Sequence, residues 1–553
     1  MRKLESILRS STAVAVVCLL SLLAAEGVLR ISGFGHPSTF FIDETDGVTR
    51  SNHHFGRLFY PPELLRGAYP SRFATQKPPG TKRIFVLGES AAAGYPEPAF
   101  SFSRILESLL RAACPETSWE IVNTGVTAMN SHAIRLIAAQ SARFEPDAAI
   151  IYMGNNEVVG PYGPGSLLGG SAVPLPVIRA VTWLRSTRTG QALQAFADWI
   201  MRSGRPDNWS GLDMFQNAKV SADDPALERV YRNFDSNLRD IIAAFRARGV
   251  PVILSTVSSN MTDCPPLGSG ENNDAALASY DQGIALRSAG RIPEAGETLR
   301  RARDADTLRF RADSRINAII RQVAAEENVP LVDAEEIFLQ LQLSSAPDDA
   351  PLFFEHVHFT LEGNRELAAA SARELADLWK GRMPCLRPDF FASVTRDQIA
   401  EDLGYSALAE GYSIGSIVAM LEKPPFASQS GNADRIGRWK TKLRAIEEKL
   451  TDPYIARSIS QLESGTAQRP RDGSLWYWLG RHYEDRKRWG EAETAYRRSL
   501  EVLPGNPAAL AQLGDLLRAQ DRPAEAAVFY EKFLQIIPSH PGYRQKILEA
   551  RMR

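Results

Sequence analysis

Short apolar runs alternate with longer helical patterns through the middle of this chain. Runs of the buried-strand type occupy residues 83–87, 119–122, 148–153, 250–255 and 329–332. Between them the pattern indicates helices over residues 102–113, 130–144, 226–248 and 314–328. This alternation predicts an α/β domain whose mostly parallel sheet is covered by helices on both faces. Such sheets bind ligands outside the carboxyl ends of their strands.

Polar segments follow the first three of these runs. The segments are Gly88-Glu89-Ser90, then Asn123-Thr124-Gly125 running on to Ala128, and then Gly154-Asn155-Asn156-Glu157. A fourth segment, Glu355-His356-Val357-His358, comes after the last predicted strand. Because the carboxyl ends of parallel strands share one edge of the sheet, we expect the first three segments to lie close together.

The residues in these segments suit acyl transfer to a serine. Ser90 is the predicted nucleophile, which needs a neighbouring base to take its proton. We expect His358 to be that base, with Glu355 holding its tautomer and offsetting the imidazolium charge. The oxyanion of the tetrahedral intermediate also needs donors. We expect these from the Ser90 N–H, from a backbone N–H of the second segment, and from the Asn156 side-chain amide.

In this order the four segments resemble the four sequence blocks of the SGNH (GDSL-like) hydrolases, over about residues 81–380. The resemblance implies a flavodoxin-like doubly wound sheet, an acyl-serine mechanism acting on an ester, and no metal or organic cofactor. It places the second-block donor, usually a glycine, at Ala128, with Gly125 earlier in the same turn. Two further departures from the family pattern are Glu89 and Glu355, which stand where aspartates are usual.

Two other histidines lie near these segments. His356 alternates with His358, so we expect it to point to the opposite side. His132 stands at a predicted helix start, where a structural role is the ordinary one.

Composition narrows the class of protein. A chain of 553 residues has room for about two to four domains. A net charge of −1 gives no electrostatic footprint for nucleic acid. The eight histidines and four cysteines form no metal-ligand spacing, so we expect no metal site. Three cysteines, Cys114, Cys264 and Cys385, lie beyond the N-terminal segment. Only two of them can pair with each other, and the sequence does not assign which.

The N-terminal segment has the layout of a secretory signal. Arg2, Lys3 and Arg9 are basic, and an apolar stretch from about Ala13 to Ala25 follows. No persuasive cleavage site follows it. We therefore expect residues 1–30 to be an uncleaved single-span membrane anchor, with the rest of the chain periplasmic or extracellular. The alternative is secretion after signal cleavage.

Two further segments lie before the first predicted catalytic block and between the third and the fourth. Residues 31–80 are expected to be an extended linker that packs on the hydrolase domain. Residues 160–225 have the character of a cap insertion. Its tryptophans Trp183, Trp199 and Trp209 have core packing as the default role, with substrate contact as the alternative.

The C-terminal part contains a repeat of 34 residues. Small and aromatic positions from Trp476 to Pro504 recur from Leu510 to Pro538. This resembles the tetratricopeptide (TPR) signature, and it predicts two repeats over residues 471–545 after a helical connector at 381–470. Residues 279–306 are either a third, inserted copy or an ordinary amphipathic helix pair. The repeats imply a protein partner, or serve only to pack the chain.

Together these features predict a membrane-anchored, extracytoplasmic serine esterase with a TPR module. The candidate substrates are an O-acetyl group of a cell-envelope carbohydrate, a lipid or thioester, and a small ester. Acyl transfer to a sugar hydroxyl is a related possibility. The alternative from a different class is a TPR scaffold whose hydrolase-like domain binds acylated glycan without turnover.

Overall fold

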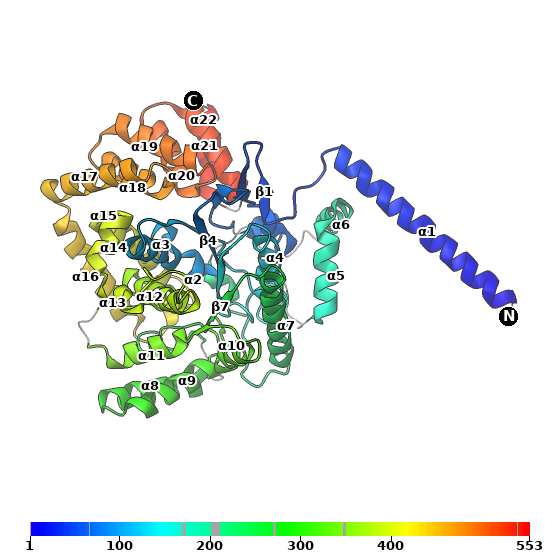
Figure 1. Ribbon diagram of the computed structural model, residues 1–553, viewed down its shortest axis with the longest axis horizontal. Helices are drawn as coiled ribbons and strands as arrows, with labels where there is room; N and C mark the ends of the chain where they lie inside the picture. The colour runs from blue at the N-terminus through cyan, green and yellow to red at the C-terminus, as the bar shows by residue number, and fades with distance from the viewer. Residues whose placement is uncertain are drawn as a thin grey trace.

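The computed structural model describes residues 2–65, 67–167, 169, 173–200, 209, 211–268, 273–346, 350–538 and 540–552 (Figure 1). The side chains of residues 2–13, 15, 541, 551 and 552 are not among those described. Parts of the predicted cap at 160–225 therefore lie outside the described residues.

A five-stranded parallel sheet forms the centre of the hydrolase domain. Its strands are β4 (Thr81–Gly88), β5 (Ser118–Asn123), β6 (Ala148–Tyr152), β7 (Val252–Ser255) and β8 (Leu331–Val332). They are ordered β5-β4-β6-β7-β8. In register, Ile84 of β4 lies between Ile121 of β5 and Ala148 of β6. The predicted parallel sheet is confirmed, and its order places β4 between two neighbours whose carboxyl ends point the same way.

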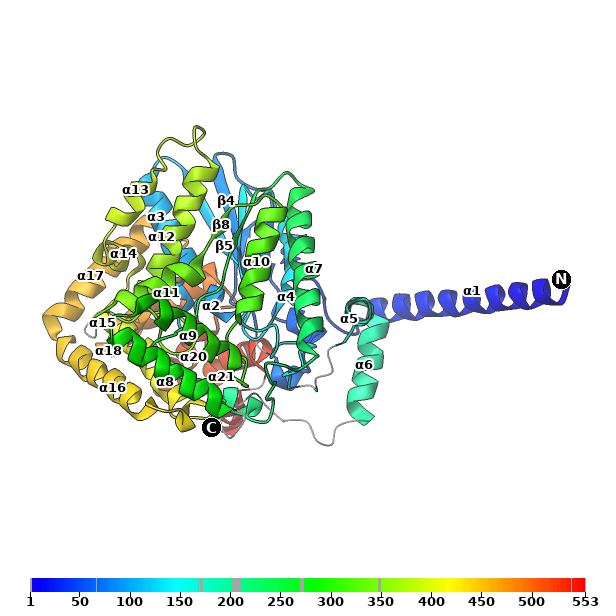
Figure 2. The same cartoon turned by 90° about the horizontal axis from the view of Figure 1, so that it is seen from below.

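Helices cover both faces of this sheet, as the alternation predicted (Figure 2). One face carries α3 (Phe102–Ala113) and α12 (Leu361–Leu378), and the other carries α4 (Ser131–Ser141), α7 (Leu227–Arg246) and α10 (Ser314–Glu326). Helix α3 buries Ile105, Leu106 and Leu109 against the sheet. Burial of apolar faces from both sides gives the sheet the continuous core that holds its strand ends in place.

The segment after residue 31 is more ordered than an extended linker. It contains a three-stranded antiparallel sheet of β1 (Phe41–Asp43), β2 (Val48–Ser51) and β3 (Arg72–Ala74). The rings of Phe41 and Phe73 meet edge to face, with centroids 5.3 Å apart, and both contact Phe144. This small sheet therefore shares the hydrophobic core of the hydrolase domain.

Helix α1 (Arg2–Ile31) stands out from the body of the protein (Figures 1 and 2). Among the helices, as far as their residues are described, none combines the length and the apolar character that a membrane crossing needs. The predicted membrane-spanning helix is therefore not supported. The side chain of Ala13, where the apolar stretch was expected to begin, lies outside those described.

The region between β6 and β7 contains α5 (Leu175–Ser186), α6 (Arg188–Ile200), the short helix η4 (Leu212–Phe215) and α7. The expectation of core packing is wrong for two of its tryptophans, because Trp183 and Trp199 are 69% and 67% exposed. Trp209 packs edge to face on Phe215 instead, with ring centroids 6.0 Å apart.

Between β7 and β8, α8 (Asp274–Ser288) and α9 (Ile292–Ala305) form a helical hairpin. Its Ala295 and Leu299 share a small core with Leu339 and Leu343 of α11 (Ala334–Ser344). The hairpin and the C-terminal helices lie at opposite ends of the molecule in Figure 1, so they do not form one continuous repeat surface.

The C-terminal part consists of helices throughout. The connector contains α13 (Pro388–Ser393), α14 (Arg396–Leu403), α15 (Ala407–Leu421), α16 (Asn432–Lys449) and α17 (Asp452–Gln468). The repeats are the pairs α18 (Gly473–Asp485) with α19 (Trp489–Val502) and α20 (Pro507–Ala519) with α21 (Pro523–Ile536), followed by α22 (Pro541–Met552). Gly480 and Gly514 approach Tyr496 and Tyr530 so closely that a Cβ atom would clash with each ring.

The repeats share a hydrophobic core with the hydrolase domain. Trp478 of α18 is fully buried in the same core as the sheet, and its ring lies 5.7 Å from that of Phe100. Arg104 of α3 forms a salt bridge with the buried Asp472, which caps α18. A disulfide joins Cys114 after α3 to Cys385 before α13, while Cys264 is buried and unpaired.

We predict that Trp478→Ala lowers the free energy of unfolding by about 3–5 kcal/mol, because it empties a fully buried indole site in the shared core. Esterase activity should then be lost at the same lower temperature at which the repeats melt. Trp489→Ala, at a site 41% exposed in the next helix, is the control and should change stability by roughly 0.5 kcal/mol or less. Unchanged thermal inactivation of the esterase in Trp478→Ala would show that the two parts fold independently.

Candidate active site

A cavity of about 640 Å³ opens at the carboxyl ends of the strands. The hydrolase domain contributes Ser90, Asn156 and His358 to its wall, and the insertion contributes Trp209 and Phe215. The remaining wall comes from the C-terminal part of the chain. Met420 lies at the end of α15 and Lys423 just after it, and Ile537 and His540 follow α21. Sequence patterns contained no signal for this last group, because contact between distant segments depends on how the domains dock.

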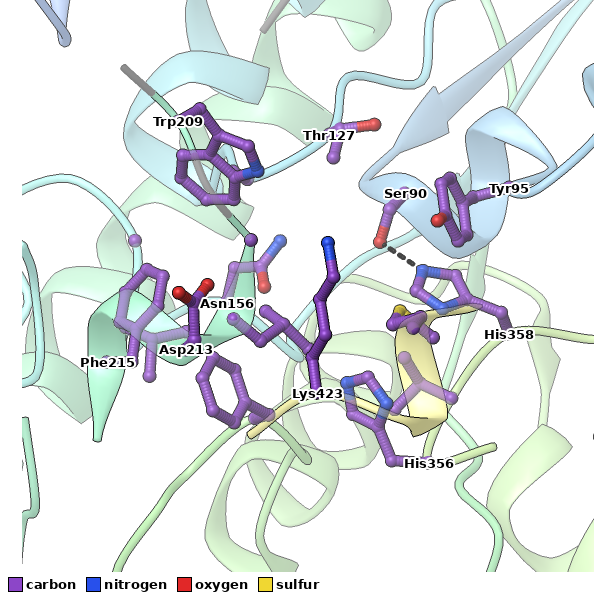
Figure 3. A pocket seen from close by; sticks show the side chains of 18 of the residues that line it. Ser90, Tyr95, Thr127, Asn156, Trp209, Asp213, Phe215, His356, His358 and Lys423 are labelled. Atoms are coloured by element: carbon purple, nitrogen blue, oxygen red, sulfur yellow. Dashed lines mark hydrogen bonds between the residues drawn. The ribbon is translucent and has the colours of Figure 1, made fainter. Parts of the chain in front are cut away.

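Ser90 lies where β4 passes into the short helix α2 (Ser90–Ala93). The turn requires Gly88, since a Cβ atom there would lie 2.0 Å from the carbonyl oxygen of Tyr152. The Ser90 Oγ lies 2.8 Å from Nε2 of His358, which is hydrogen-bond distance (Figure 3). The structure thus brings together two residues that are 268 positions apart in the chain.

Glu355 completes a hydrogen-bonded chain behind Ser90. Its fully buried carboxylate is hydrogen-bonded to Nδ1 of His358 and also accepts the His358 backbone N–H at 3.1 Å. The second carboxylate oxygen is hydrogen-bonded to Nδ1 of His356. The expectation that His356 points away from this site is therefore wrong. The longer glutamate side chain, where the family usually has aspartate, contacts both rings.

Burial sets the ionisation of both histidines. It lowers the pKa of His358 to about 3 and holds the pKa of His356 well below its usual range. The ring of Tyr95 covers His358, with centroids 4.7 Å apart. A neutral His358 at ordinary pH has the lone pair on Nε2 that a general base needs.

Ser90, Ala128 and Asn156 line the cavity and carry three hydrogen-bond donors. The Asn156 side chain faces the cavity, and its Nδ2 is held by the carbonyl oxygen of Met129 at 2.9 Å. The backbone N–H groups of Ser90 and Ala128 have no hydrogen-bond acceptor within the described part of the chain. Because all three residues line the cavity that contains the Ser90 hydroxyl, their N–H groups are the candidate donors to an oxyanion.

The second segment shows why glycine is usual at one of its positions. Ala128 has φ +61°, a left-handed conformation that glycine adopts freely and other residues adopt at a cost of roughly 1–2 kcal/mol. The Tyr60 hydroxyl donates to the Ala128 carbonyl at 2.9 Å and supports this turn. Gly125 is not a free donor, because its N–H is hydrogen-bonded to Oδ1 of Asn123 at 2.8 Å.

Glu89 has a positioning role that the sequence did not reveal. Its buried carboxylate accepts the backbone N–H groups of Asn155 and Asn156, at 2.9 and 3.2 Å. Burial, with the nearby Glu157, raises its pKa well above the usual value. Glu89 therefore ties the segment after β4 to the segment after β6. The only sequence signal was an acidic residue directly before the predicted nucleophile.

Asn155 and His132 lie near the site but do not line the cavity. The Asn155 side chain is buried and accepts the Ala312 N–H at 3.0 Å, which separates its role from that of Asn156. His132 is buried 2.9 Å from the Asn237 amide, and burial lowers its pKa to about 4. The structural role expected for His132 agrees with these contacts.

Within the described residues, one group of side chains has ligand atoms close enough together for a metal ion, namely Glu355, His356 and His358. The Nδ1 atoms and carboxylate oxygens of this group are hydrogen-bonded to one another. The arrangement suits proton transfer from Ser90, since His358 Nε2 is directed at the serine.

Comparison with known proteins agrees with this site. The family model of the GDSL-like lipase/acylhydrolase family matches residues 86–366, which include all four segments. The chain belongs to this family. A tetratricopeptide repeat model matches residues 473–516. The chain is thus a GDSL-like hydrolase with a C-terminal repeat region, as its sequence predicted.

Solved structures similar to this GDSL-like hydrolase are distant in sequence. A lipase/acylhydrolase from Enterococcus faecalis is 13% identical, with 54% of this chain and 96% of that chain covered and a TM-score of 0.28. An acetyl xylan esterase is 14% identical, with coverages of 52% and 97% and a TM-score of 0.27. A GDSL-like lipase from Bacteroides thetaiotaomicron is 12% identical, with coverages of 54% and 89% and a TM-score of 0.26. No curated protein matches the chain.

We predict that Asn156→Ala lowers kcat by roughly 10²–10³, the usual effect of losing one preorganised oxyanion donor. Asn155→Ala is the matched control, because its side chain holds the Ala312 backbone and lies outside the cavity wall. Asn155→Ala should lower the melting temperature and have a much smaller effect on kcat than Asn156→Ala. A larger loss of kcat in Asn155→Ala than in Asn156→Ala would contradict the assignment.

We also predict that kcat/KM is retained well below pH 6.5, the ordinary pKa of histidine, because burial lowers the pKa of His358. Stability, in contrast to kcat/KM, should decrease over this pH range. The unfolded chain binds more protons at its histidines below pH 6.5, so the free energy of unfolding decreases as pH falls from 6.5 toward 3. Rates and thermal melts measured over the same pH series separate the two effects. Activity of the still-folded enzyme that falls by half near pH 6.5 would contradict this prediction.

Proposed function

We propose that this protein is a serine esterase that works through an acyl-serine intermediate, with Ser90 as nucleophile, His358 as general base and Glu355 as its partner. The observation that carries the proposal is the hydrogen-bonded chain from Ser90 through His358 to Glu355, which opens on a cavity beside Asn156. Three residues in this relation are the requirement for activating a serine hydroxyl.

In the first step the Ser90 Oγ attacks the ester carbonyl carbon while His358 Nε2 takes the hydroxyl proton. The carbonyl oxygen becomes an oxyanion, which accepts hydrogen bonds from the Ser90 and Ala128 N–H groups and from Asn156. The bond to the leaving alkoxide then breaks, and His358 returns its proton to that oxygen. Water, activated in turn by His358, attacks the acyl-serine and releases the acid and free Ser90.

The wall of the cavity favours an acyl group carried on a carbohydrate, such as an O-acetyl group of a cell-envelope polysaccharide. Trp209, Phe215 and Phe310 offer aromatic surface on one side. Asp213 and Lys423 add polar groups to the lining of the cavity (Figure 3). Aromatic faces with polar groups beside them suit sugar rings, which have apolar faces and hydroxyl edges. If a sugar hydroxyl replaced water in the second step, the same residues would transfer the acyl group.

We further propose that the hydrolase domain functions outside the cytoplasm. The Cys114–Cys385 disulfide supports this location, because such bonds persist in oxidising compartments. The basic and apolar N-terminal segment supports it independently, either as an uncleaved anchor or as a cleaved signal. In this compartment an envelope glycan ester is a reachable substrate, and the repeats are available to a protein partner.

We predict that Ser90→Ala and His358→Ala each remove nearly all hydrolysis of p-nitrophenyl acetate. The double variant should be scarcely slower than either single variant, because the two residues act as one unit. His132→Ala is a control histidine outside the cavity and should keep most of the wild-type rate per folded molecule. Acetate release from an O-acetylated oligosaccharide, compared with acid release from a phospholipid, tests the substrate class.

Activity that survives in Ser90→Ala would contradict the nucleophile. Wild-type protein that binds an acetylated oligosaccharide but hydrolyses neither ester would favour the alternative, a repeat scaffold that binds acylated glycan without turnover.

A further inference from the structure

The helical hairpin formed by α5 and α6 presents an apolar surface to solvent. Its exposed large apolar side chains are Val177, Trp183, Leu184, Leu193, Phe196, Trp199 and Ile200. Phe196 and Trp199 stack with ring centroids 6.0 Å apart. Single exposed apolar residues are ordinary, but a continuous set on two adjacent helices marks an interaction surface. We call these seven residues the hairpin surface.

Several polar side chains of the hairpin bind the body of the protein, while most of its large apolar side chains face solvent. Arg179 is paired with Asp240 of α7 at 2.8 Å, and Arg185 donates to the Leu58 carbonyl at 3.1 Å. Gln191 accepts the His36 N–H at 2.9 Å and donates to the His36 carbonyl at 3.1 Å. Ile178 of α5 is buried, whereas the seven residues of the hairpin surface are exposed, so this surface suits an apolar environment.

Helix α1 is fastened to this hairpin. The Glu26 carboxylate accepts the backbone N–H groups of Arg188 and Thr189, at 3.1 and 2.8 Å, at the start of α6. The Thr189 hydroxyl donates to the same carboxylate at 3.0 Å. Glu26 thus satisfies free donors of a neighbouring helix, and the end of α1 lies beside α6 in Figures 1 and 2.

The described part of α1 is apolar and exposed as well. Its exposed large side chains are Val14, Val16, Val17, Leu19, Leu20, Leu22, Leu23, Val28 and Ile31. They lie around the helix and not along one stripe, which leaves α1 without a protein surface to cover. Helix α1 and the hairpin stand on the same side of the protein, so the hairpin surface has a second apolar element next to it (Figure 1).

We propose that the hairpin surface is a membrane-binding surface that inserts into the interface of a lipid bilayer next to α1. A pair of tryptophans with phenylalanine and branched aliphatic residues is the composition that resides at this depth. Interfacial binding requires no helix that crosses the bilayer.

This placement has a consequence for the active site. A second cavity, of about 710 Å³, lies beneath α6 and is lined by its Gln191, Gln194 and Asp198. Tyr60 lines this cavity and also the cavity that contains Ser90. The hairpin surface is thus connected to the catalytic cavity through a cavity that shares Tyr60 with it.

Tryptophan quenching tests the proposal directly, because α1 contains no tryptophan. The full-length protein is reconstituted into phosphatidylcholine–phosphatidylglycerol vesicles with brominated acyl chains, which quench only tryptophans within the bilayer. We expect the wild-type protein to be quenched. Quenching should fall roughly fivefold or more in Trp183→Phe/Trp199→Phe, which keeps the surface apolar. Trp489→Phe, in the repeats, is the matched control and should leave the quenching unchanged.

Polar substitution provides a second measurement. Leu193→Gln/Phe196→Gln should shift protein from the vesicle fraction to the soluble fraction in flotation, whereas the exposed pair Val528→Gln/Leu548→Gln in the C-terminal helices α21 and α22 should not. Thermal melts check that all variants are folded. Equal quenching in wild type and Trp183→Phe/Trp199→Phe would overturn the proposal. So would a lipid-independent dimer that Leu193→Gln/Phe196→Gln dissociates, since a second copy would then cover the surface. Hydrolysis of p-nitrophenyl acetate is measured alongside, and its loss would concern the catalytic proposal alone.

Discussion

The buried Glu355 carboxylate is the contact on which the proposed chemistry depends. It is fully enclosed, and it is hydrogen-bonded to the Nδ1 atoms of both His356 and His358. These bonds fix the orientation of the His358 ring and direct its Nε2 at Ser90. Burial alone favours neutral histidine, whereas the carboxylate stabilises the imidazolium that forms during reaction. The site therefore holds a base that is neutral at rest and stabilised when it becomes charged.

The sheet brings the other parts of the site to this base. Parallel strands end at one edge, and that geometry places the segments after β4, β5 and β6 beside one another. Glu89 then fixes the detail by binding the backbone of Asn155 and Asn156 across the strand ends. A buried carboxyl group is costly unless it is hydrogen-bonded, and both carboxyl oxygens of Glu89 accept hydrogen bonds.

The sequence predicted the elements whose signals are local. Apolar runs predicted the five strands of the sheet, and short polar segments predicted that Ser90, Asn156 and His358 would line one cavity. Contacts set by docking were not predicted. No periodic pattern in the sequence indicates that Trp478 is buried in the hydrolase core or that Ile537 lies in the cavity wall. Alternation misplaced His356, because a strand-like reading does not hold in the turn that surrounds Glu355. Exposure of Trp183 and Trp199 was also missed, since composition alone does not distinguish a cap from a lipid-facing surface.

Covalent labelling with a fluorophosphonate, followed by peptide mass spectrometry, tests the central claim most directly. The reagent reacts with a serine that a neighbouring base activates, and it needs no knowledge of the natural substrate. The account predicts one adduct, on Ser90, whose rate of formation falls by roughly 10³ or more in Glu355→Ala or His358→Ala. Wild-type protein that stays unlabelled, or an adduct on another serine, would contradict it.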